Sequence, residues 1–155
     1  MHTKKLYKHL ILIFIIVLID QLTKGFVNQN SDLLIQTVNI FPFLNFVFVT
    51  NTGVSFGFLS GLDITLYLGI ISIIISILLF RWLINSKDLV EGFGISLIIA
   101  GAIGNGIDRI IDGYVIDFID IYYKSFHWPS FNIADSSITL GVVTYFYRNL
   151  TLKAK

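Results

Sequence analysis

Residues 62–83 form an apolar run whose charged residues lie only near its two ends. A helix of this length would span ~33 Å at ~1.5 Å per residue, which is enough to cross the hydrocarbon core of a bilayer. The composition agrees, because 55% of the 155 residues are hydrophobic and the mean hydropathy is +0.79. Charged residues make up 14%, compared with about 25% in ordinary soluble domains. The sequence therefore predicts a membrane protein.

Three further segments are expected to span the membrane, at residues 6–27, 91–111 and 133–150. The first follows a cluster of lysines, as in a secretory signal peptide, but no small-x-small cleavage site comes after it. We therefore expect an uncleaved helix there, with a removed signal as the alternative. The predicted fold class is an all-α membrane bundle of four helices with a small β element, in a single domain covering residues 1–155.

The basic residues predict the orientation of this bundle. Four spans would place both termini and the 84–90 loop on one side, with eight of the 11 lysines and arginines. An excess of these residues marks the cytoplasmic side, so both termini are expected there. The outer segments are then residues 28–61 and 112–132. Alternating aromatic and β-branched residues at 44–50 and 114–121 predict strands of a small sheet on the outer membrane surface.

Several function classes find no support in the sequence. Cysteine is absent, which excludes thiolate catalysis and cysteine-ligated metals, and a net charge of +1 gives no sign of nucleic-acid binding. No H-E-x-x-H motif is present, and His127 is interpreted with Tyr123 and Trp128 as part of an interfacial aromatic belt rather than as a metal ligand. Ser55 has no identifiable histidine or lysine partner, so a serine nucleophile is not expected. Neither a metal nor a cofactor is predicted.

Polar residues gather at the outer ends of the expected spans, where their cost in lipid indicates function. Helical spacing puts Asp20 and Lys24 on one face, and likewise Asn105 with Asp108 and Arg109. Structural interpretations compete with the functional one. The first pair could be only an ion pair, and the second group could only close a helix end, with Arg109 paired to Asp108.

Other acidic and polar residues have simpler interpretations by local pattern. Asn132 is placed as an N-cap and Asp135 stands three residues later at the capping-box position, where glutamate is more usual. Asp112 and Asp120 are interpreted as solvated carboxylates of an outer loop. Small residues at four-residue spacing on the third helix predict that it is central in the bundle. They are Ser96, Ala100 and Gly104.

Five separated motifs, taken in order and in this membrane setting, resemble those of the lipoprotein signal peptidases, or signal peptidase II. The motifs cover nearly the whole chain. They are Asp20-Gln21-x-x-Lys24, Asn51-x-Gly53-x-Ser55-Phe56, Gly101-Ala102-x-Gly104-Asn105-x-x-Asp108-Arg109, Val115-x-Asp117-Phe118 and Phe131-Asn132-x-Ala134-Asp135.

The resemblance implies an aspartic endopeptidase of the bacterial cell membrane, with its active site at the outer face. It would cleave diacylglyceryl-modified prolipoproteins just before the lipidated lipobox cysteine, without a cofactor, and would be inhibited by globomycin. Asp117 and Asp135 fall on the catalytic positions. A monomer suffices, because all five motifs lie in one chain. The supporting or substrate-binding positions fall on Asp20, Lys24, Asn51, Asn105, Asp108, Arg109 and Asn132.

Elementary chemistry agrees with this implication. Two carboxyl groups that share a site cannot both ionise cheaply, so the pair holds one proton and can act as base and acid on water and a peptide carbonyl. An aromatic clamp on the substrate is a further hypothesis. Its residues are Phe41, Phe43, Phe46, Phe48 and Trp128. A transporter or proton channel, a purely structural subunit, and another type of intramembrane protease are the alternatives, although the Gly-x-Gly-Asp and Gly-x-Ser-Gly motifs are missing.

Overall fold

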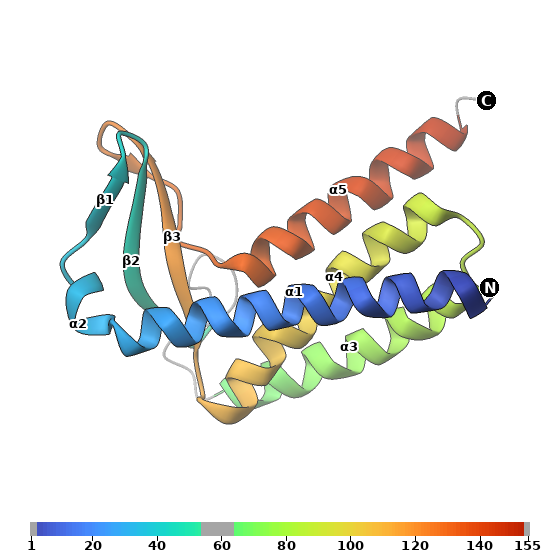
Figure 1. Cartoon of the computed structure of the whole chain (residues 1–155), viewed down its shortest axis with the longest axis horizontal. Helices are drawn as coiled ribbons and strands as arrows, with labels where there is room; N and C mark the ends of the chain where they lie inside the picture. The colour runs from blue at the N-terminus through green and yellow to red at the C-terminus, as the bar shows by residue number, and fades with distance from the viewer. Residues whose placement is uncertain (1–2, 54–63, 154–155) are drawn as a thin grey trace.

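The computed structural model describes residues 3–53 and 64–153 of the chain (Figure 1). Its long helices run alongside one another, and a small sheet stands off one end of the bundle. The helices are α1 (Thr3–Gln29), the short α2 (Ser31–Leu34), α3 (Thr65–Asn85), α4 (Leu89–Ile111) and α5 (Ile133–Lys153). The long helices coincide with the four expected segments to within a few residues at each described end. The start expected at residue 62 lies outside the described residues.

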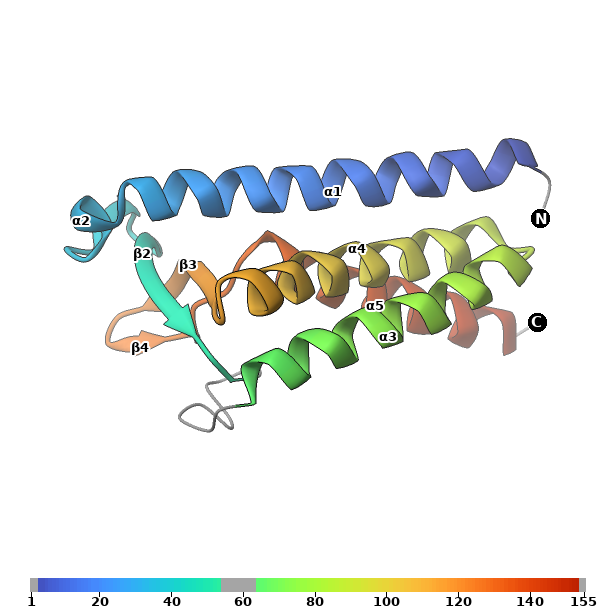
Figure 2. The ribbon, with the colours of Figure 1, turned by 90° about the horizontal axis from the view of Figure 1, so that it is seen from below.

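Helix α4 lies at the centre of the bundle. It packs against α1, α3 and α5, and Figure 2 shows it between α1 and the other two. In the apolar stretch of α4, 67% of the residues are buried inside the protein, compared with 22% in α1 and 17% in α3. Ser96 and Ala100 are almost completely buried. The small-residue spacing therefore predicted the central helix correctly.

Glycines let α4 and α5 approach until their backbones touch. A Cβ atom on Gly141 would lie 2.6 Å from the carbonyl oxygen of Gly94, and one on Gly101 would lie 2.2 Å from that of Ala134. Neither gap leaves room for a side chain, and such small-residue contacts are typical of helices packed in membranes. The start of α5 is therefore fixed against the C-terminal half of α4.

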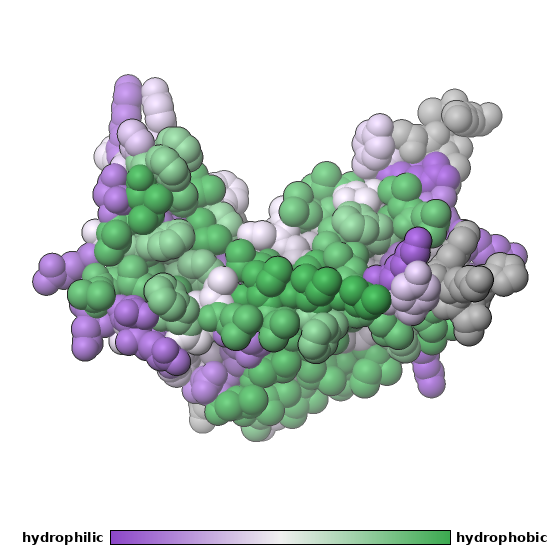
Figure 3. Space-filling view, in the orientation of Figure 1, coloured by the Kyte–Doolittle hydropathy of each residue, from purple (hydrophilic) through white to green (hydrophobic). Residues whose placement is uncertain are grey.

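Among the residues that the structure describes, three helices are long and apolar enough to cross a membrane, over Leu6–Gln29, Thr65–Asn85 and Leu89–Ile111. Large apolar side chains such as Phe14 and Leu78 point outward, and Figure 3 shows a continuous apolar surface over the helices. Water-soluble proteins rarely expose so large an apolar area. The architecture is that of a multi-pass membrane protein.

The sheet is antiparallel throughout and has the strand order β1-β2-β3-β4. Its strands are β1 (Val38–Phe41), β2 (Leu44–Asn51), β3 (Val115–Tyr123) and β4 (Phe126–His127). Strands β2 and β3 confirm the two predicted strands, whereas the shorter β1, β4 and α2 were not predicted. Val27 and Leu34 pack against Ile116 and Phe118 of β3, so an apolar core holds the sheet to the end of α1.

Candidate active site

Asp117 lies within β3 with only 3% of its surface exposed. The Nδ2 of Asn51, on the neighbouring strand β2, donates to its Oδ2 at 3.0 Å, and the Nδ2 of Asn132 donates to its Oδ1 at 2.7 Å. Asn51 Oδ1 accepts a hydrogen bond from the backbone N–H of Gly53 at 3.0 Å, which leaves the NH₂ group of Asn51 facing the carboxyl. Each oxygen of Asp117 therefore has an amide donor.

Asp135 occupies the first turn of α5, where it takes part in a capping box. Its backbone N–H donates to Asn132 Oδ1 at 2.9 Å, and its own Oδ2 accepts from the backbone N–H of Asn132 at 3.2 Å. Reciprocal bonds of this kind satisfy N–H groups that a helix end leaves unpaired. The capping interpretation is confirmed. Asn105 of α4 also donates from Nδ2 to Asp135 Oδ1 at 2.8 Å, so the carboxyl has a role beyond the cap.

Asn132 connects the two carboxyl groups, because its side chain bonds Asp117 and its backbone bonds Asp135. Burial and, after it, the nearby charge of Asp135 raise the pKa of Asp117 from 3.8 to about 6, against the hydrogen bonds from Asn51 and Asn132. Mutual repulsion of this kind is expected where two carboxyl groups share one proton. The arrangement can supply a general acid and a general base from one pair.

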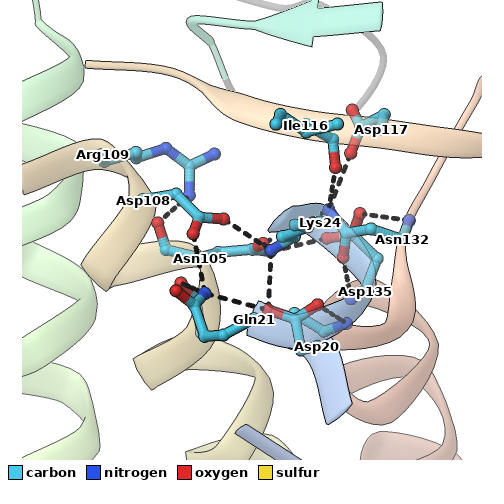
Figure 4. A network of polar contacts seen from close by, with 12 residues as sticks. Asp20, Gln21, Lys24, Asn105, Asp108, Arg109, Ile116, Asp117, Asn132 and Asp135 are labelled. Carbon is cyan, nitrogen blue, oxygen red and sulfur yellow. Dashed lines mark hydrogen bonds and ion pairs between the residues drawn. The ribbon is translucent and has the colours of Figure 1, made fainter. Parts of the chain in front are cut away.

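A second group of polar side chains gathers next to the pair, around Lys24 of α1 (Figure 4). Its Nζ donates to Asp20 Oδ2 at 2.8 Å, to Asp108 Oδ2 at 2.6 Å and to Asn105 Oδ1 at 2.9 Å. The expected pair of Asp20 with Lys24 is therefore present. The pair is buried inside the protein, with 1% of Asp20 and 3% of Lys24 exposed.

Arg109 does not have the partner that the sequence suggested. Asp108 binds Lys24, while Arg109 donates from Nη2 to the carbonyl oxygen of Gly53 at 2.8 Å. The end of α4 thus holds the backbone just after Asn51. Sequence reasoning also gave no role to Gln21, whose Nε2 donates to Asp108 Oδ1 at 2.7 Å. Its place in the Asp20-Gln21-x-x-Lys24 motif was the available signal.

The two aspartates line a cavity of about 710 Å³. Asn51, Asn105 and Arg109 make its polar end. Apolar side chains of α3 and α5 form its flanks, and Trp128 and Phe131 lie on the wall that follows β4. The flanking residues are Leu68, Ile71, Ile75, Ile138 and Leu140. The cavity can therefore accept a molecule with a polar part beside the carboxyl pair and an apolar part between two helices.

Asp120 was interpreted as a solvated carboxylate, and this was wrong. It is 5% exposed, accepts from Asn45 Nδ2 at 2.8 Å and bonds His127 Nδ1 at 2.9 Å. His127 is thus the partner of a buried carboxyl, and no group of three potential metal ligands occurs among the described residues. Asp112 is exposed, as expected. Ser55 lies outside the described residues.

Comparison with known proteins adds a family to this geometry. A family model described as signal peptidase (SPase) II matches residues 12–151. The chain belongs to the signal peptidase II family. Its similarity to curated members is high, with 46% identity to the lipoprotein signal peptidase of Thermodesulfovibrio yellowstonii, covering 94% of this chain and 97% of that protein. A lipoprotein signal peptidase of Coxiella burnetii is 42% identical, with 90% and 88% covered.

Solved structures agree with this assignment. A bacterial membrane enzyme solved by the in meso method at 2.3 Å resolution superposes with a TM-score of 0.84 at 36% identity, covering 93% of this chain and 88% of that one. A second such enzyme, at 1.9 Å resolution, gives a TM-score of 0.80 at 36% identity, covering 92% of each chain. The chain is thus a signal peptidase II and a membrane protease. This excludes the transporter, the structural subunit and the other protease types as alternatives.

Proposed function

We propose that this signal peptidase II removes the signal peptide from diacylglyceryl-modified prolipoproteins, cleaving before the lipidated cysteine, with Asp117 and Asp135 as its catalytic pair. The observation that carries the proposal is the pair itself. The buried carboxyl group of Asp117 and the half-buried one of Asp135 meet through Asn132 at the wall of a largely apolar cavity. The supporting residues act on this pair through the contacts described above.

In the proposed reaction the pair holds one proton. The ionised carboxylate takes a proton from water as the water oxygen attacks the scissile carbonyl carbon, and the protonated carboxyl donates to the carbonyl oxygen. The tetrahedral diol then collapses and the C–N bond breaks. The protonated carboxyl gives its proton to the leaving nitrogen, while the other carboxylate takes a hydroxyl proton from the diol, so the pair again holds one proton. Because the two groups titrate jointly, the proton belongs to the pair rather than to one residue.

The shape of the cavity supports a lipidated substrate. Its flanks between α3 and α5 are lined mostly by leucine and isoleucine, with Ser72, Ser136 and Thr139 among them. The apolar side chains suit acyl chains, while the peptide bond would lie beside the carboxyl groups. Of the five residues of the hypothetical clamp, Trp128 lines the cavity. Phe41 and Phe43 instead stack on each other at the turn between β1 and β2, with ring centroids 5.8 Å apart. We therefore assign a substrate contact to Trp128 and Phe131.

We further propose one domain with four spans, α5 being the fourth, in the bacterial cell membrane. Helix α1 begins and α5 ends at the same end of the bundle in Figure 1, which suits two cytoplasmic termini. The site would then lie at the outer face, where a lipid-anchored cysteine emerges from the bilayer. A monomer suffices, because one chain supplies every residue of the pair and its supports. Globomycin is expected to bind in the same cavity.

The variants Asp117→Asn and Asp135→Asn, purified in detergent, test the pair. With a diacylated lipobox peptide, each is expected to lower kcat by at least ~10³-fold, because removing one member of a catalytic unit removes most of its effect. Asp112→Asn is the control, since Asp112 is exposed. Each protein is checked for folding by size-exclusion chromatography and circular dichroism. Near-normal cleavage by either folded variant would refute the pair, and equal cleavage of the unlipidated peptide would refute the lipid requirement.

A further inference from the structure

Lys24 is a buried cation with no spare hydrogen-bond donor. An ammonium group has three N–H bonds and no acceptor. In Figure 4 its contacts go to two carboxylates, Asp20 and Asp108, and to the amide of Asn105. The carboxylates are its counterions, as a buried charge requires. The third bond is different, because it reaches a neutral residue that itself touches Asp135.

The amide of Asn105 lies between Lys24 and Asp135 with a defined orientation. Its Oδ1 accepts from Lys24 Nζ at 2.9 Å, and its Nδ2 donates to Asp135 Oδ1 at 2.8 Å. The two ends of an amide have nearly the same shape but opposite hydrogen-bonding roles. A rotated amide would direct NH₂ at the ammonium group and oxygen at the carboxylate, so both contacts would become repulsive. Asn132 Nδ2 also donates to Asn105 Oδ1, at 3.3 Å, so the lysine makes the shorter of two contacts that favour the orientation giving Asp135 a donor.

Asp20 fixes the position of Lys24 relative to α5, the helix that carries Asp135. Asp20 Oδ2 accepts from Lys24, while Asp20 Oδ1 accepts from the backbone N–H of Ala134 at 2.9 Å. Ala134 directly precedes Asp135 in the first turn of α5. Asp20 and Lys24 of α1 are therefore connected to Asp135 indirectly in two ways, through the backbone of α5 at Ala134 and through the side chain of Asn105.

We propose that Lys24 is a positioning residue for peptide-bond hydrolysis, which holds Asn105 Oδ1 so that Asn105 Nδ2 stays directed at Asp135 Oδ1. The inference rests on the proposed role of Asp135 in catalysis. A simple ion pair between Lys24 and Asp108 would join α1 to α4 equally well without the contact to Asn105.

The test removes Lys24 without leaving excess buried charge. The variant Lys24→Met/Asp108→Asn loses one cation and one anion, while Asp20 still caps α5. Its kcat on a diacylated lipobox peptide is expected to fall ~10²-fold, since small misplacements of catalytic groups have effects of this size. KM should stay within about threefold of the unmodified enzyme, because no cavity-lining residue is changed. Lys87→Met is the matched control, because Lys87 is exposed beyond the other end of α4.

Two measurements distinguish positioning from a structural role. The first combines the variant with Asn105→Leu. If Lys24 acts through Asn105, the combined variant is no slower than Asn105→Leu alone, whereas independent roles would multiply the losses. The second is the pH dependence of kcat. The positive charge of Lys24 lowers the pKa of Asp117, so its loss should move the acidic limb to higher pH, which a general loss of folding would not do.

Lys24→Gln/Asp108→Asn is a second variant, which keeps an amide donor at position 24 and is milder for folding. Its kcat is expected to lie between those of the Met variant and the unmodified enzyme. A kcat within threefold of normal in the Met variant, or multiplicative losses with Asn105→Leu, would overturn the proposal. Asp117→Asn and Asp135→Asn are measured in parallel. If they are inactive while the Lys24 variants are normal, only the positioning role fails; if they are active, the catalytic pair fails.

Discussion

Gly101 of α4 lies directly against the carbonyl group of Ala134, the residue before Asp135 in α5. A Cβ atom at position 101 would be 2.2 Å from that oxygen and 2.6 Å from Ile138 Cγ1. The neighbour is backbone rather than the end of a flexible side chain, so α5 itself would have to move. The position of a proposed catalytic carboxyl therefore depends on the absence of one methyl group.

Gly101→Ala is accordingly expected to displace the first turn of α5. Overpacking of this kind costs about 1–3 kcal/mol, and we expect cleavage of a diacylated peptide to fall at least ~10-fold. Thermal unfolding in detergent and kcat on the lipopeptide are the measurements. Gly25→Ala is the matched control in another long helix, because a Cβ there would have nothing within 4 Å. It should keep or raise stability. Equal behaviour of the two variants would contradict the contact.

The pKa of Asp117 predicts how stability changes with pH. Burial and the charge of Asp135 raise this pKa from 3.8 to about 6. A carboxyl whose pKa is raised on folding stabilises the protein fully below pH ~3.8, and this contribution is lost as the pH rises through about 6. The melting temperature should therefore fall between pH 4 and pH 7 more steeply in the unmodified enzyme than in Asp117→Asn. Parallel curves for the two proteins would show that Asp117 does not titrate in this range.

The buried carboxyl of Asp120 should support the sheet and the cavity wall. Asp120→Ala would leave Asn45 Nδ2 without its acceptor and release His127, and an unpaired buried polar group costs about 1–3 kcal/mol. We expect a lower melting temperature and a raised KM, because His127 directly precedes Trp128 on the cavity wall. Asp112→Ala, at an exposed carboxyl, should change neither. Destabilisation by both variants to the same degree would argue against the specific role of Asp120.

The absence of cysteine allows the proposed topology to be tested directly. Single cysteines are introduced as Lys87→Cys in the loop between α3 and α4, and as Lys124→Cys at the turn between β3 and β4. In spheroplasts, a membrane-impermeant maleimide should label position 124 but reach position 87 only after permeabilisation. Labelling of position 87 in intact spheroplasts would reverse the orientation, and labelling of both would contradict the number of spans.

Much of this arrangement was predictable because helical spacing and capping are local properties. Four-residue spacing put Asp20 beside Lys24, and the three-residue step from Asn132 to Asp135 gave the capping box. The error at Arg109 has a physical reason. Adjacent residues on a helix point in different directions, so Arg109 could not share the contacts of Asp108 and reaches Gly53 instead.

Cross-strand partners were less accessible from the sequence. Asp120 is buried because β2 places Asn45 opposite it and β4 brings His127 beside it. Neither pairing follows from the alternation within β3 alone, since register depends on the turns and on the neighbouring strand. The short β1, β4 and α2 carry too few residues for a periodic pattern to show.

The capping box at the start of α5 gives Asp135 a structural role that is separate from its proposed role in peptide hydrolysis. Its Oδ2 satisfies the backbone N–H of Asn132, whose side chain in turn satisfies the backbone N–H of Asp135. The carboxyl group therefore cannot swing toward a ligand without loosening the first turn of its own helix. Inhibitors that pull the Asp135 side chain out of the capping box should increase amide hydrogen exchange at the start of α5. Ligands that bind the side chain in its capping position should decrease that exchange.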